Sequence, residues 1–138
     1  MTVTDLIKTQ LATSGNQLTK VFEDMPENLF EEKLVPSAMS PADTLIHLSE
    51  CYVASKAAMS GEKHEWGTFT IEDRSPANLL AVHKSLRDQA CEAALAQPDH
   101  VDHAFDFIVL HDCYHIGQMA QFRLANTPDW NPYSLYEG

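Results

Sequence analysis

The stretch SPAD at residues 40–43 decides the fold, because it is a complete start signal for a helix. Its serine can cap the helix N-terminus, its proline suits the first helical position, and its aspartate meets the positive end of the helix dipole. We expect this helix to end near Gly61, since glycine readily takes the left-handed conformation of a helix end. A near-copy of the signal, SPAN at residues 75–78, predicts another helix that stops before Pro98.

Apolar residues at three- and four-residue spacing predict two more helices, one over 5–24 and one over 99–126. The apolar stripe of the 75–97 helix is expected to be Leu79, Val82, Leu86, Ala90 and Ala93. That of the 99–126 helix is expected to be Val101, Phe105, Ile108, His111, His115, Met119 and Phe122. The expected core includes Ile7, Leu11, Leu18, Leu48, Leu86, Ile108 and Phe122. The sequence therefore predicts an all-α four-helix bundle.

The chain of 138 residues is long enough for one domain, which we expect to span 1–138. Two long connections, 26–35 and 62–74, can each cross the end of the bundle or run along its side. A brief alternation of apolar and polar residues over 66–72 is predicted to be an ordered loop. The link between the third and fourth helices is only about three residues, so these two helices should pack antiparallel. The other helix directions are not fixed by the sequence.

The charge balance argues against a nucleic-acid or membrane partner. Twenty acidic residues face nine basic ones, a formal net charge of −11, and no run of Lys or Arg offers a local exception. The N-terminus has charged residues and no apolar core, so no signal peptide is expected, and no stretch is apolar enough to span a membrane. Cys51, Cys91 and Cys113, without paired spacing, favour a reducing compartment, the cytoplasm, and are expected to be small core residues.

Seven histidines are many for this length, and two of them share one face of the last predicted helix. His111 and His115 are four residues apart, a spacing that stacks two imidazoles on the same side of a helix. A metal ion about 2.0–2.1 Å from each ring nitrogen fits between them. Both also lie on the apolar stripe that faces the core, where an imidazole is costly to bury without partners for its nitrogens.

A third candidate ligand, His47, lies on the helix predicted to begin at residue 40, on a face of small side chains. Three neutral histidines with an open position describe a catalytic type of metal site, in contrast to a closed four-ligand structural site. The alternative is that they are ordinary hydrogen-bonded core or surface residues. Cys51, one turn from His47, and His83 are rivals that could complete or replace the three. The remaining histidines, expected in solvent, are His64, His100 and His103.

Two better-known metal motifs do not fit this sequence. The stretch HDCYH at 111–115 has the spacing of the zinc-peptidase motif HExxH, but Asp112 stands where that motif needs its glutamate base. No histidine and only two acids follow His115, so a third peptidase ligand is absent. A di-iron carboxylate bundle requires Glu-x-x-His on two helices, and no such pattern occurs here.

Two motifs carry a family resemblance: SPADTLIHL at 40–48, which contains His47, and HDCYHIGQ at 111–118. The second resembles an H-x-x-x-H followed by Gly-Gln. With the two motifs about 64 residues apart, the sequence resembles the DinB-like superfamily of metalloenzymes, named for a damage-inducible protein, over about residues 5–126. Many members carry a bulky aromatic residue shortly after the first histidine, and Tyr52 is the nearest candidate here. The connection before the last helix is shorter than in the family.

The resemblance implies a DinB-like four-helix bundle that holds one divalent metal ion on His47, His111 and His115. Zinc or nickel is most expected, with iron or manganese as alternatives. Relatives transfer thiols such as bacillithiol or mycothiol, or isomerise maleylpyruvate with a thiol cofactor, and homodimers are common among them. The resemblance therefore implies a metal-dependent enzyme of the thiol-dependent S-transferase or hydrolase type. Its partners would be a small-molecule substrate and a low-molecular-weight thiol.

Two carboxylates near the predicted ligands are the candidate catalytic residues. Glu50 is one turn after His47, and Asp112 adjoins His111. Either can accept a proton from a group bound to the metal, or orient the far nitrogen of a ligand histidine. The alternative for both is a solvated helix face.

Two further functions stay open: a non-catalytic metal-binding or stress-related dimer, and a helical interaction module without metal. Homodimerisation is expected because several apolar residues lie off the main stripes and need a second face to cover them. These residues are Leu80, Phe107, Val109 and Leu110. The family resemblance points the same way.

Overall fold

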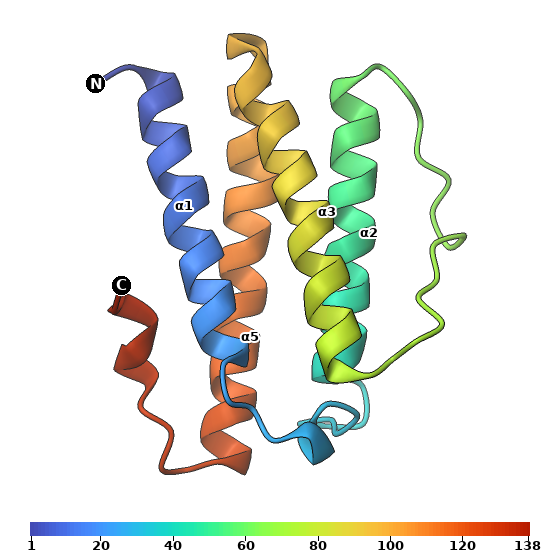
Figure 1. Cartoon of the computed structure of the whole chain (residues 1–138), viewed down its shortest axis with the longest axis vertical. Helices are drawn as coiled ribbons and strands as arrows, with labels where there is room; N and C mark the ends of the chain where they lie inside the picture. The colour runs from blue at the N-terminus through green and yellow to red at the C-terminus, as the bar shows by residue number, and fades with distance from the viewer.

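The computed structural model describes residues Met1–Gly138, and all of its regular structure is helical. Figure 1 shows four long helical segments that pack side by side, so the predicted all-α bundle is confirmed. The long helices are α1 (Val3–Phe22), α2 (Pro41–Met59), α3 (Pro76–Ala96) and α5 (Leu110–Asn126). The shorter pieces are η1 (Glu27–Leu29), η2 (Pro98–His100), α4 (Val101–His103), η3 (Ala104–Val109) and η4 (Pro132–Tyr136). No helix combines the length and the apolar character needed to cross a membrane.

The helix α2 begins and ends where its sequence signals predict. Ser40 Oγ accepts a hydrogen bond of 3.0 Å from the backbone N–H of Asp43, and Pro41 occupies the first helical position. The chain leaves the helix through Gly61, whose φ of +76° is a left-handed conformation that glycine adopts without steric cost. These end signals fix the extent of α2, and its buried side chains, among them Leu45, Leu48 and Tyr52, show which side of the helix faces the bundle.

The starts of α3 and α1 differ from expectation. Ser75 makes no side-chain cap on α3. Instead Asp73 organises this corner, because its carboxylate accepts the N–H of Ser75 and its carbonyl accepts the side-chain amide of Asn78. The helix α1 begins earlier than predicted, since Thr2 and Asp5 form a reciprocal capping box.

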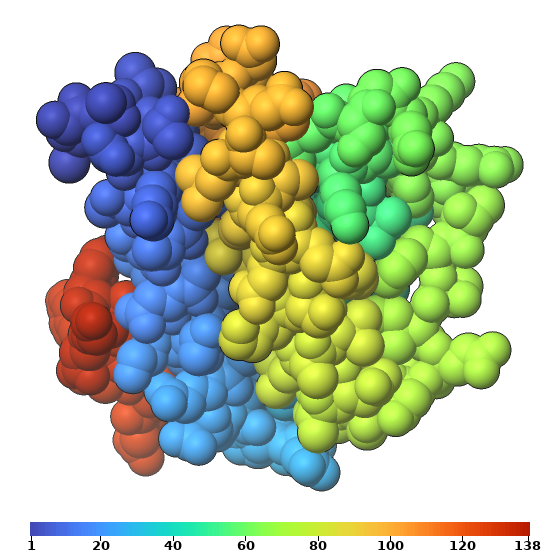
Figure 2. Space-filling model, turned by 45° about the horizontal axis from the view of Figure 1, so that its top comes forward, coloured from blue at the N-terminus to red at the C-terminus, as the bar shows by residue number.

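The helices run in an order that the sequence left open. In Figure 1, α1 and α5 descend, whereas α2 and α3 both ascend, and the loop over residues 60–75 returns along the outer side of α2. The helix α3 packs against α2, and α1 packs against α5. The opposite directions predicted for α3 and α5 are confirmed, but α3 packs mainly against α2 and not against α5 as the prediction had it. The long 60–75 loop is what allows α2 and α3 to lie parallel. Figure 2 shows α3 between α1 on one side and α2 with its loop on the other.

Residues 101–126 form one continuous helix that contains a π-helical turn at Ala104–Val109. A π turn places five residues where an α-helix would place four, so Ala104 and Val109 are both buried although they are five residues apart. The sequence prediction assumed α periodicity and was wrong at two positions for this reason. Phe105 was expected in the core and is 38% exposed, whereas Val109 was expected on the outside and is 6% exposed.

The buried face of α3 is also rotated from the predicted one. Val82 and Leu86 are only half-buried, whereas His83 and Arg87 are buried in their place. Apart from Leu86, the predicted core residues are all buried. The rotation brings two polar side chains inside the bundle, where they meet hydrogen-bond partners on α1, α2 and α5.

Candidate metal centre

Three histidine side chains converge between α2 and α5, and they are the three that the sequence singled out. His47 comes from α2, and His111 and His115 come from consecutive turns of α5. His111 Nε2 lies 3.3 Å from His47 Nε2 and 3.0 Å from His115 Nε2. One ligand atom from each of the three lies within 4.8 Å of the others, which makes this group able to hold a metal ion.

Hydrogen bonds between the three rings cannot satisfy this arrangement. A ring nitrogen of a neutral imidazole carries either one hydrogen or one lone pair, so it makes one good hydrogen bond. His111 Nε2 has two close nitrogen neighbours, and one of the two contacts must therefore lack a hydrogen bond. A cation at the centre removes the conflict, because all three lone pairs can then point at it.

The spacing of the nitrogens also fits a metal ion. Ligand nitrogens about 2.0–2.1 Å from an ion are separated by about 3.3 Å at a tetrahedral angle and about 2.9 Å at a right angle. The two Nε2 separations of 3.0 and 3.3 Å fall in this range. Imidazole nitrogen is a good ligand for zinc, nickel, iron and copper, so the donor set by itself selects a transition metal over calcium or magnesium.

Burial keeps these imidazoles in the neutral form that binds metal. Burial lowers the pKa of His47 and of His111, and the charge of Glu50 partly opposes the change at His47. Burial and the two neighbouring imidazoles lower the pKa of His115 to about 4. All three rings are therefore neutral near pH 7, with lone pairs available.

The far nitrogen of His115 has no partner. His115 Nδ1 is buried and makes no hydrogen bond, although a ligand histidine usually donates its second N–H to an acceptor. Its neighbour Gln118 donates its amide to the hydroxyl of Tyr114 instead. The position of the ring is therefore set by packing and by the contact of its Nε2 with His111 Nε2.

A cavity of about 610 Å³ adjoins the three histidines, bounded by α2, the 60–75 loop and the π turn. His111 lies in its wall, as does Cys51, whose sulfur is 3.7 Å from His47 Nε2. Burial and the nearby charge of Glu50 raise the pKa of the Cys51 thiol to about 11. Cys51 is half-buried, in partial agreement with the sequence prediction, whereas Cys113 was expected in the core and is exposed. Trp66 and Phe107 also line the cavity, which is large enough for a small organic molecule.

Glu50, a predicted catalytic residue, holds the wall of this cavity in place. Its Oε1 accepts hydrogen bonds from His64 Nε2 at 2.9 Å and from the backbone N–H of Gly67 at 3.1 Å. The bond from His64 lowers the pKa of the Glu50 carboxyl. His64 was expected in solvent, and this pairing is the reason that it is largely buried. Glu50 therefore joins the 60–75 loop to α2.

Asp112, the second predicted catalytic residue, is buried, and the partners of both its carboxylate oxygens are residues other than the three histidines. Oδ1 accepts from the Tyr52 hydroxyl, and Oδ2 accepts from Arg87 Nε at 3.0 Å. Arg87 also donates to the carbonyl of Leu11 and to Ser14 Oγ. Sequence reasoning missed this buried network, because Arg87 and Tyr52 are far from Asp112 in the chain. The one available signal for a buried polar pair was that His83 and Arg87 are four residues apart and directly follow Val82 and Leu86 of the predicted apolar stripe.

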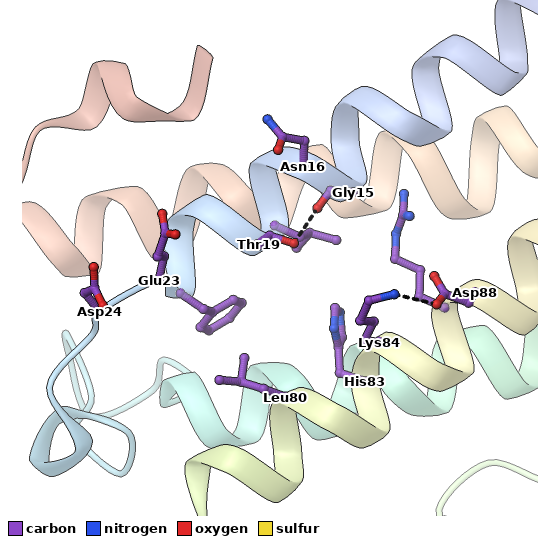
Figure 3. Close-up of a pocket in the computed structure, with 12 residues that line it drawn as sticks. Gly15, Asn16, Thr19, Glu23, Asp24, Leu80, His83, Lys84 and Asp88 are labelled. Carbon is purple, nitrogen blue, oxygen red and sulfur yellow. Dashed lines mark hydrogen bonds and ion pairs between the residues drawn. The ribbon is translucent and has the colours of Figure 1, made fainter. Parts of the chain in front are cut away.

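His83, the rival histidine ligand, lies elsewhere in the bundle. Figure 3 shows it pointing from α3 towards α1, into a second cavity of about 430 Å³ that Gly15, Leu80 and Lys84 also line. Its Nε2 is 3.4 Å from the hydroxyl of buried Tyr52. Burial and the charge of Arg87 lower the pKa of His83 to about 4. His83 is therefore a neutral core histidine beside a hydrogen-bonded tyrosine.

The side chains and their geometry define this site. Its features are three neutral imidazoles from two helices, the half-buried thiol of Cys51 next to His47, and a cavity whose wall includes Cys51 and His111. No protein-family model, curated protein or solved structure gives a significant match to the chain. The structure is thus a helical bundle with a cluster of three histidines that could hold a metal ion.

Proposed function

We propose that this protein is a DinB-like metalloprotein that binds one divalent ion on His47, His111 and His115. The observation that carries the proposal is the convergence of three Nε2 atoms at 3.0 and 3.3 Å without enough hydrogens to bond them. Zinc or nickel is the proposed ion, with iron as an alternative that imidazole also binds well and manganese as one that only the family resemblance suggests.

We propose further that the protein is an enzyme that acts on a small molecule, as a thiol-dependent S-transferase or a hydrolase. A bound ion of this kind lowers the pKa of a water or thiol that it holds, which supplies a nucleophile near neutral pH. Neutral histidines leave the positive charge of the ion intact. The 610 Å³ cavity gives a substrate access to His111, and Trp66 and Phe107 provide apolar surface against which it can pack. A low-molecular-weight thiol is the proposed second substrate.

A specific observation favours the alternative, a non-catalytic metal-binding or stress-related protein. The two carboxylates proposed as proton acceptors are both engaged elsewhere, Glu50 with the 60–75 loop and Asp112 with Tyr52 and Arg87. Their catalytic roles stay predictions. A thiol-conjugation assay on the metal-loaded protein separates the two functions, because only the enzyme consumes its thiol in a metal-dependent way.

We propose that two copies of the chain associate. Phe107, Leu110 and Tyr114 are exposed along one side of the helix that carries two of the three histidines. Leu80 and Val109, the other residues of the predicted dimer face, pack in or against the core and do not contribute. The net charge of −11 argues against a nucleic-acid partner, and we expect the protein in the cytoplasm. Light scattering at micromolar concentration tests the association.

Metal content after dialysis tests the proposed site. The wild-type protein should retain about one ion per chain, and His47→Ala, His111→Ala or His115→Ala should retain little. His83→Ala is the matched control, because His83 is a buried neutral histidine that lies outside the group of three. Protons compete with the ion for imidazole, and the pKa of each of the three rings is lowered, to about 4 at His115, so the metal should stay bound at pH 7 and leave as the pH falls towards 4. Stoichiometric metal in His111→Ala would contradict the assignment.

A further inference from the structure

Two facing helices each present a pair of metal-ligating side chains at four-residue spacing. On α5 the pair is His111 and His115. On α2 His47 is followed four residues later by Cys51, so the two side chains lie on the same side of the helix one turn apart. Cys51 Sγ is 3.7 Å from His47 Nε2, and the thiol is free of any disulfide. The thiol therefore lies at the edge of the group of three imidazoles.

The separation of the sulfur and nitrogen atoms is close to that of two ligands on one ion. A tetrahedral ion with a nitrogen ligand at about 2.0–2.1 Å and a thiolate at about 2.3 Å separates the two atoms by about 3.5 Å. The observed 3.7 Å to His47 is close to this value, but Cys51 is outside the group whose ligand atoms all lie within 4.8 Å of one another, so coordination requires a rotation about its Cα–Cβ bond that brings the sulfur nearer to His111 and His115. The space for that rotation exists, since Cys51 borders the 610 Å³ cavity.

We propose that the thiolate of Cys51 is the fourth ligand of the ion on His47, His111 and His115, so that the resting centre has three histidines and one cysteine. This inference rests on the proposed metal site. When the ion binds, the S–H bond of Cys51 breaks and its proton passes to solvent. The sulfur electron pair forms the bond to the ion, and no atom changes oxidation state.

A fourth protein ligand changes what the site can do. Three histidines and a thiolate form the closed tetrahedral set that zinc favours, and the soft sulfur selects against manganese. The thiolate reduces the net charge of a divalent centre from +2 to +1. It also lies on the side of the cavity, so a small molecule that reaches the ion has to displace the sulfur or add as a fifth ligand. Cys51 thereby governs access to the metal.

Cobalt(II) is the probe that reports the sulfur directly. Added to the metal-free full-length protein, it should give visible ligand-field bands from the histidine site and a near-ultraviolet sulfur-to-cobalt charge-transfer band. Cys51→Ser should lose the charge-transfer band and keep the ligand-field bands. Its cobalt affinity should fall by about 10–100-fold or more, since loss of a residue that only hydrogen-bonds to a metal ligand already lowers affinity by this factor. Cys91→Ser and Cys113→Ser, which alter the other two thiols, are the matched controls and should keep both bands.

The outcomes distinguish this inference from the metal site on which it rests. Ligand-field bands without a charge-transfer band in the wild type would leave the three histidines as ligands and overturn the role of Cys51. A charge-transfer band that survives in Cys51→Ser would overturn it as well. Absence of any cobalt spectrum would refute the metal site itself. Alkylation followed by mass spectrometry gives a second test that needs no variant. Bound cobalt should protect Cys51 and leave Cys113 reactive, and equal labelling of Cys51 with and without the ion would refute the proposal.

Discussion

Replacement of Gly15 by alanine should destabilise the protein, although alanine is the better helix former. A Cβ atom at Gly15 would lie 2.6 Å from an Arg87 terminal nitrogen and 3.2 Å from its Cζ, whereas ordinary contacts begin near 3.4 Å. The guanidinium would have to retreat by about 0.8 Å from a position in which three hydrogen bonds hold it, to Asp112, Leu11 and Ser14. These bonds are 2.8–3.0 Å long, and one or two of them would stretch beyond useful length.

Two opposing effects set the size of the change. Alanine in place of glycine inside a helix contributes about 1 kcal/mol of stability. Each hydrogen bond from a charged group that is lost costs about 1.5–3 kcal/mol, and a movement of this size disrupts one or two of the three. The net free energy of unfolding should therefore fall by about 0.5–5 kcal/mol. The loss of hydrogen bonding exceeds the gain in helix propensity because the only atoms that could move aside belong to Arg87, and its guanidinium is held by hydrogen bonds.

Urea unfolding of the metal-free protein, followed by circular dichroism, measures this change. Gly117→Ala in α5 is the matched control, since a Cβ there meets no atom within 4 Å. It should leave the protein unchanged or raise its stability by up to about 1 kcal/mol. If Gly15→Ala were as stable as Gly117→Ala, the buried guanidinium would not be held as described.

Three further predictions concern buried and tethering groups. Arg87→Met leaves the buried Asp112 carboxylate without its cation, which should cost about 3–5 kcal/mol in urea unfolding, and adding Asp112→Asn should recover part of the loss. The pKa of His83 is about 4 in the folded protein, against 6.5 when unperturbed, so its contribution to stability is complete above pH 6.5 and declines as the pH falls towards 4. His83→Gln should flatten that decline in unfolding curves, and an unchanged slope would contradict the burial of a neutral ring. Glu50→Ala removes the acceptor of His64, so trypsin should cut the 60–75 loop several-fold faster, and an unchanged cleavage pattern would show that the tether is dispensable.

The sequence predicts well those features that depend on neighbouring residues. The SPAD signal places the start of α2 correctly, and the proline at position 98 limits α3, because capping and proline sterics act within one turn. The i, i+4 spacing of His111 and His115 is equally local. His47 was harder to find, since its pairing with α5 depends on helix directions that only the complete fold specifies.

Features that depend on distant partners were missed. Periodicity assigned α3 an apolar buried face, but a polar residue can be buried when partners from other helices satisfy it, as Asp112 satisfies Arg87. Sequence periodicity also assumes 3.6 residues per turn, and it therefore failed across the π turn, where Phe105 and Val109 exchange sides. In both cases the information needed lies on another element of the structure.

The π turn has a consequence for the helix that carries His111 and His115. The turn contains one more residue than an α-helical turn, so the pattern of buried positions before Ala104 is shifted by one residue from the pattern after Val109, although the helix is continuous. Because the turn takes up the surplus residue, both halves keep their buried faces; if the same residues wound as a regular α-helix, one half would be rotated against the other by about 100°. Since α5 is fixed to the bundle by the buried Met119 and Phe122, such a rotation would fall on the N-terminal half and carry His103 out of the cavity wall, and the π turn prevents it. The length of this turn, as much as the identity of its side chains, therefore sets which residues line the cavity beside the histidines.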